Sequence, residues 1–134
     1  MKLIIKLIIT ILFAISSVSF GSSIIQEEIK WTIPNMVTMT VYTINKYTVK
    51  PARTASGILL NKINPKKHKI IAISRDLLGK YNFGDRVLIV GAGKHDGEYF
   101  VEDLMHERFK NKIDILINPN DKLTKLYNIK MYKL

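Results

Sequence analysis

Short runs in which apolar and polar side chains alternate recur along the chain and predict β-strands. The clearest run is residues 37–43 (VTMTVYT), where apolar side chains alternate with hydroxyl-bearing ones. Successive side chains of a strand point to opposite faces, so this period indicates a strand with one buried face. Further strands are predicted from alternating or β-branched apolar runs at 58–60, 69–73, 86–90, 98–101, 113–117 and 128–132.

Helical signals are few and short. Ser74 is a suitable N-cap for a single turn that ends near Gly79, and Asn118 or Asn120 could cap a short helix that runs through Leu126. No helix long enough to cross a sheet is predicted between the strands, which argues against βαβ units. The pattern predicts a mainly β protein, a small barrel of six to seven strands with one or two short helices.

The N-terminal residues 1–21 have the pattern of a secretory signal peptide. Lys2 and Lys6 precede an apolar run over residues 7–15, and the small residues Ser19 and Gly21 fit a cleavage site after Gly21. The run is shorter than the roughly 20 residues of a transmembrane helix, which favours cleavage over an uncleaved anchor. We therefore expect export to the periplasm, cell envelope or extracellular space, with a lead-in at 22–35 and one domain at 36–134.

Charge and cysteine content narrow the possible partners. The chain has no cysteine, which excludes disulfides, thiol chemistry and a lipid anchor on cysteine. Without Lys2 and Lys6, the 21 basic residues fall to 19 against 11 acidic ones, a net charge of about +8 that favours polyanions. Outside a cell these include wall polymers and anionic lipid head groups. We expect a monomer with no nucleic-acid partner and no stable membrane insertion after signal cleavage.

Two familiar chemical motifs fail on spacing. Gly91 and Gly93 follow an apolar strand as in a dinucleotide-binding turn, but Gly97 comes one position too late and a strand follows it instead of a helix. A β-hairpin whose loop uses these glycines fits better. The three histidines, at 68, 95 and 106, lack the spacing of a zinc site. We expect no cofactor and no metal.

Six segments, taken in order, resemble a known family. They are Thr40–Tyr42, Thr54–Gly57, Ile71–Asp76, Phe83–Ile89, Tyr99–Asp103 and Phe109–Ile115. Their order resembles the three-aspartate (3D) domain, a double-psi β-barrel similar to the catalytic barrel of membrane-bound lytic transglycosylase A. The resemblance extends over residues 36–134, and its most specific part is the interval from Asp103 to Asp114.

The resemblance implies that Asp114, Asp103 and Asp76 are the catalytic aspartates of a peptidoglycan lytic transglycosylase. Such an enzyme cleaves the β-1,4 bond between N-acetylmuramic acid and N-acetylglucosamine and leaves a 1,6-anhydro product. Asp114 would be the general acid and then the base, and Asp103 would tune or hold it. Candidate substrate-binding residues are Thr40, Tyr42, Thr54, Ser56 and Lys110.

The strand pattern gives a separate reason to consider Asp114. Alternation places it on the face opposite Ile113 and Ile115, where it is either exposed or lines a cleft. A carboxylate beside another carboxylate in a partly dry site has a raised pKa, which a general acid needs near neutral pH. The alternative is a solvent-facing residue that pairs with Lys112 or Arg108.

Two other functions fit the same residues. A non-catalytic barrel that binds cell-wall glycan would use the same basic surface, and it is favoured by Leu104, which follows Asp103 where the family has a glycine close by. A structural exported domain with an interaction role is the third. The pair of Asp103 and Asp114 favours the enzyme.

Overall fold

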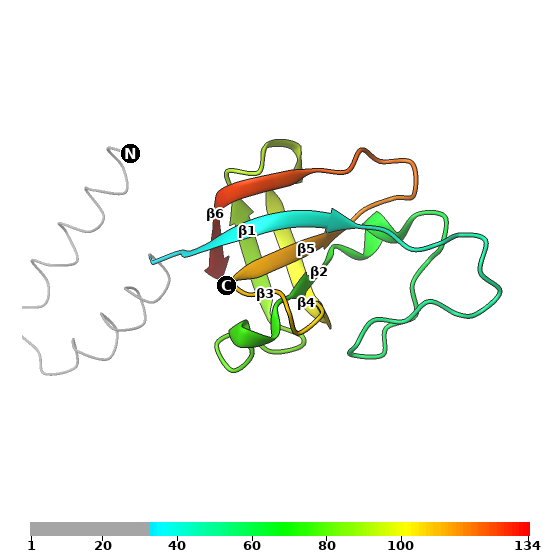
Figure 1. The fold of residues 1–134 in the computed structure, drawn as a ribbon, viewed down its shortest axis with the longest axis horizontal. Helices are drawn as coiled ribbons and strands as arrows, with labels where there is room; N and C mark the ends of the chain where they lie inside the picture. Colours follow the sequence, from blue (N-terminus) through cyan, green and yellow to red (C-terminus); the bar gives the residue numbers. More distant parts are fainter. Residues whose placement is uncertain (1–32) are drawn as a thin grey trace, which may run out of the picture. The chain divides into compact units, whose positions relative to one another are not determined.

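The computed structural model describes residues 33–134, in which Pro34–Leu134 form one compact unit (Figure 1). The predicted signal peptide at 1–21 and most of the predicted lead-in at 22–35 lie outside the described residues. Within 33–134, no helix has the length and apolar character needed to cross a membrane.

Six strands form a closed barrel. They are β1 (Asn35–Tyr42), β2 (Ile70–Ile73), β3 (Arg86–Val90), β4 (Gly97–Leu104), β5 (Lys112–Leu116) and β6 (Lys125–Lys133). Around the barrel they follow the order β1-β5-β2-β4-β3-β6, and β6 returns to β1. The prediction of a mainly β protein built as a small double-psi β-barrel of six to seven strands is confirmed, with six strands.

The strand order mixes parallel and antiparallel neighbours. β1 pairs in parallel with β5, and β2 pairs in parallel with β4. The remaining four pairs, which are β1·β6, β2·β5, β3·β4 and β3·β6, are antiparallel. Because each parallel pair joins segments far apart in the sequence, residues from four different regions meet on neighbouring strands.

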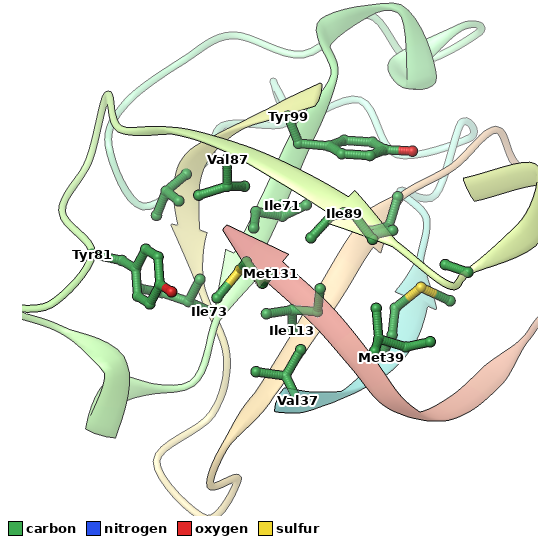
Figure 2. Close-up of a cluster of buried hydrophobic side chains, with 14 of the residues drawn as sticks. Val37, Met39, Ile71, Ile73, Tyr81, Val87, Ile89, Tyr99, Ile113 and Met131 are labelled. Atoms are coloured by element: carbon green, nitrogen blue, oxygen red, sulfur yellow. The ribbon is translucent and has the colours of Figure 1, made fainter. Parts of the chain in front are cut away.

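The barrel interior is filled by the apolar face of each strand. In β1, for example, Val37, Met39 and Val41 are buried, and the residues between them are partly exposed. Figure 2 shows side chains from different strands converging on this core, including Ile71, Val87, Ile89, Ile113 and Met131. The alternation that predicted the strands therefore also separates the interior face from the outer face.

Helical structure within residues 33–134 is limited to three single 3₁₀ turns: η2 (Pro65–His68), η3 (Arg75–Leu77) and η4 (Gly93–His95). The turn predicted after Ser74 is confirmed as η3. The helix predicted from Asn118 or Asn120 to Leu126 is wrong, because residues 118–124 are turn and coil and β6 already begins at Lys125.

Two further predictions concern local elements. Residues 58–60 do not form a strand, since only Leu59 makes an isolated bridge, to Arg53. The hairpin predicted around the three glycines is confirmed, because β3 and β4 pair antiparallel across residues 91–96. Gly91 and Gly93 have φ values of 92° and 61°, which L side chains seldom adopt.

Candidate carboxylate site

Four residues form a row across four adjacent strands on the outer face of the barrel. Thr40 of β1 pairs with Asp114 of β5, Asp114 pairs with Ala72 of β2, and Ala72 pairs with Asp103 of β4. Their strand neighbours Met39, Ile71 and Ile113 belong to the buried core, so alternation turns the row outward. Strand pairing thus brings Asp103 and Asp114 to either side of one residue.

Two details of β2 and β4 set this arrangement. The pairing of β2 with β4 shifts register between Ile71 and Ala72, so that Ala72 lies opposite Asp103 instead of Glu102. Such a bulge re-aims the side chains that follow it. Ala72 is buried and has the smallest possible chiral side chain, which leaves room for the two carboxyl groups beside it. The sequence alone did not single out Ala72.

Asp103 is held by three protein donors. The Tyr42 hydroxyl donates to its Oδ2 at 3.0 Å, and the backbone N–H groups of Ala55 and Leu104 donate to its Oδ1 at 2.9 and 3.0 Å. Oδ2 therefore has one partner and Oδ1 has two, and the three donors come from different segments of the chain. These contacts fix the orientation of the carboxylate.

Asp114 is in a contrasting environment. It is half-buried, and its Oδ1 has no hydrogen-bond partner among the described residues. Burial raises the pKa of Asp114, a hydrogen bond with the Thr40 hydroxyl opposes the rise, and the negative charge of Asp103 adds to it. The site thus combines a carboxylate with three hydrogen-bond donors and a half-buried carboxyl group whose own pKa is raised.

The Tyr42 hydroxyl is hydrogen-bonded to Asp103 and is also affected by the charge of Asp114. Burial raises its pKa, and the charge of Asp103, its hydrogen bond to Asp103 and the charge of Asp114 raise it further. The hydroxyl therefore remains a proton donor over the whole physiological range. Sequence analysis assigned Tyr42 to substrate binding, and in the structure its hydroxyl is engaged with Asp103.

Thr54 and Ser56, also predicted to bind substrate, shape the loop that supplies the Ala55 N–H group. Thr54 is buried, and its hydroxyl accepts a hydrogen bond from the Ile58 N–H at 3.0 Å and contacts the Ser56 hydroxyl at 2.9 Å. The Ser56 N–H donates to the carbonyl of Glu102 at 3.1 Å. These contacts attach the loop to β4 beside Asp103.

Asp76 and Lys110 lie where β2 ends and β5 begins. Asp76 is exposed and accepts a hydrogen bond from the Asn111 N–H at 2.9 Å. A hydrogen bond from Ser74 lowers the pKa of Asp76, with smaller contributions from Asn111 and Lys110. Within residues 33–134, no hydrogen bond or ion pair joins Asp76 to Asp103 or Asp114. The structure therefore unites two of the three predicted aspartates and gives Asp76 contacts that hold the chain entering β5.

The raised pKa of Asp114 makes this carboxyl group suited to proton transfer. Among the described residues, no group of three histidine, cysteine or acidic side chains could hold a metal ion. No model of a known protein family matches the chain, and no curated protein is similar to it at a significant level.

Proposed function

We propose that the protein is an exported peptidoglycan lytic transglycosylase whose general acid–base residue is Asp114. The observation that carries the proposal is the contrast between the two neighbouring carboxyl groups. Asp103 accepts three protein hydrogen bonds, whereas Asp114 is half-buried with an unpartnered oxygen. Burial and a neighbouring negative charge raise the pKa of Asp114, and a carboxyl group with a raised pKa is typical of a general acid. The resemblance to the three-aspartate domain supplies the substrate class.

In the proposed reaction, protonated Asp114 donates its proton to the glycosidic oxygen as the bond from that oxygen to C1 of N-acetylmuramic acid breaks. The resulting carboxylate then accepts the proton of the 6-hydroxyl group of the same sugar. The oxygen of this hydroxyl forms the new bond to C1, which yields the 1,6-anhydro product without added water. Asp114 ends the cycle protonated, so no proton is gained or lost.

Asp103 has a supporting role in this proposal. Its negative charge contributes to the raised pKa of Asp114, so more of the acid form is available near neutral pH. Its three hydrogen bonds keep it in position beside Ala72. We therefore treat Asp103 as a positioning and tuning residue.

The test uses purified peptidoglycan and mass spectrometry of the released fragments. The wild-type protein should release anhydro-muropeptides, and Asp114→Asn should reduce their rate of release by about 10²- to 10⁴-fold, the usual contribution of general acid–base catalysis. Glu107→Gln is the matched control, because Glu107 is an exposed carboxylate in the loop between β4 and β5. Ordinary hydrated muropeptides, or full activity of Asp114→Asn, would contradict the proposal.

A non-catalytic barrel that binds wall glycan is the second candidate. It is favoured by the full engagement of Asp103 and Tyr42 within the protein, because hydrogen bonds that serve the fold need no reaction. This candidate predicts co-sedimentation with peptidoglycan and no released fragment. Failure to bind peptidoglycan at all would exclude both candidates.

A further inference from the structure

The long connection from β1 to β2, residues 43–69, lies at one end of the barrel. β1 is parallel to β5 and β5 is antiparallel to β2, so the end of β1 and the start of β2 lie at the same end of the barrel. Figure 1 shows this segment extending well beyond the arrowhead of β1. We call residues 43–69 the basic loop.

The basic loop has charges of one sign only. It contains no aspartate or glutamate, whereas its basic residues are Lys46, Lys50, Arg53, Lys62, Lys66, Lys67 and Lys69. Among the described residues, the one ion pair that involves the loop is at its base, where Lys66 lies 3.9 Å from Asp121. Most of the positive charge is therefore free to attract an external anion.

Large apolar side chains occupy the most exposed parts of the same loop. Val49 is 98% exposed, Ile63 is 83% exposed and Tyr47 is 82% exposed. The Lys62 ammonium group donates to the Thr48 carbonyl, which joins the stretch that holds Tyr47 and Val49 to the stretch that holds Ile63. The two stretches that carry these apolar side chains are thus linked, and each of the three residues is next to a lysine in the sequence, namely Lys46, Lys50 or Lys62.

We infer that the basic loop docks the protein on the surface of an anionic phospholipid bilayer. Lysines around the loop would contact lipid phosphates, and Tyr47, Val49 and Ile63 would enter the interfacial region. Each basic residue near an anionic bilayer contributes about 1 kcal/mol, a roughly fivefold change in partitioning. Apolar side chains with a basic surround are typical of proteins that lie on membranes.

A bilayer explains the loop better than a soluble polyanion does. A soluble polyanion would pair with the lysines, but it would not bury the exposed valine and isoleucine side chains of the loop. The inference is independent of the proposed reaction. The loop is attached to the barrel, because the Ala55 N–H donates to Asp103 and the Ser56 N–H donates to the Glu102 carbonyl. Docking would therefore place the carboxylate site at a fixed distance from the membrane.

The absence of cysteine permits a direct test in the protein from Ser22 onward, without the apolar N-terminal run. Val49→Cys is labelled with an environment-sensitive fluorophore and mixed with phosphatidylcholine vesicles that contain 0% or roughly one-third phosphatidylglycerol, close to the charge of natural anionic membranes. Phe83→Cys is the matched control, because Phe83 is an exposed apolar residue in the connection from β2 to β3, at the opposite end of the barrel. The label at 49 should shift to the blue with anionic vesicles only, and the label at 83 should not shift.

The charge requirement is tested in the same labelled protein. Replacing Lys46 and Lys50 by serine should weaken the transition at position 49 by about 25-fold in lipid concentration. Equal shifts on neutral and anionic vesicles, equal shifts at 49 and 83, or an undiminished transition without the two lysines would each overturn the inference. A label at 49 that responds as strongly to soluble polyphosphate as to vesicles would assign the loop to a soluble polyanion instead.

Discussion

Replacing Tyr42 by phenylalanine isolates the contact that connects β1 to the carboxylate site. The change keeps the aromatic ring and removes only the hydroxyl group that donates to Asp103 at 3.0 Å. Hydrogen bonds to charged groups contribute about 1.5–3 kcal/mol, and Asp103 retains two backbone donors after the substitution. We therefore expect the lower end of that range, a loss of about 1.5 kcal/mol in the free energy of unfolding.

The assay is urea and thermal unfolding of the variant and wild-type proteins. For a unit of this size, 1.5 kcal/mol corresponds to a fall in Tm of about 6–12 °C. Tyr47→Phe is the matched control, because the Tyr47 side chain is largely exposed. Loss of an exposed hydroxyl group should change stability by less than about 0.5 kcal/mol.

A double-mutant cycle with Asp103→Ala identifies the interaction. If the Tyr42 hydroxyl acts through Asp103, the double variant should be more stable than the sum of the two single effects predicts, with a coupling energy of about 1 kcal/mol or more. A coupling energy below about 0.3 kcal/mol would refute the reasoning, because the two groups would then contribute independently.

Three further predictions concern titrating groups. Asp103→Asn removes a charge that raises the pKa of Asp114, so the pH optimum of the proposed lytic activity should move to lower pH in a rate profile. Folding raises the pKa of Asp114, so deprotonation of this group destabilises the fold. The free energy of unfolding of the wild-type protein should therefore fall as pH rises from about 4 through the folded pKa. Asp114→Asn should therefore unfold at higher urea than the wild-type protein, by a margin that is absent at pH 3 and grows as pH rises. Burial, with Lys94 and Lys66, lowers the pKa of His95, so wild-type stability should fall as pH drops below about 6.5. His95→Phe should weaken that dependence in urea unfolding at pH 5 and 8, and an unchanged slope would contradict this role.

The strands were predictable because their periodicity is local. Alternation in residues 37–43 follows directly from one buried face, and β1 places Val37, Met39 and Val41 in the core. The error after Asn118 has a local cause as well. Asn118 begins a turn, since its carbonyl accepts from the Asp121 N–H and its own N–H donates to the Asp121 carboxylate, but that turn leads into β6 and not into a helix. The Asn118 side chain caps no helix, because its oxygen accepts from the Lys66 N–H. Capping residues suit turns and helices alike.

The site was predictable only in part because it depends on pairing between distant strands. The resemblance singled out Asp103 and Asp114, and the register places both beside Ala72. Nothing in the local sequence identifies the bulge that aligns Asp103 with Ala72 or the backbone donor at Ala55. Such contacts depend on the closed barrel, which no short window of sequence describes.

The position of β6 in the barrel has a consequence for how the chain folds. β6 is the last of the six strands in the sequence and pairs with both β1 and β3, so the earlier strands cannot form a closed cylinder without it. A ribosome-bound chain that lacks this strand would expose the unpaired edges of β1 and β3, which are open to association with other chains. Pairing β1 with β5 and β6 also requires contacts across about 70 to 100 residues, and such high contact order slows folding. The barrel should therefore close only after synthesis of β6 is complete, and the last strand sets the time at which the whole unit can fold.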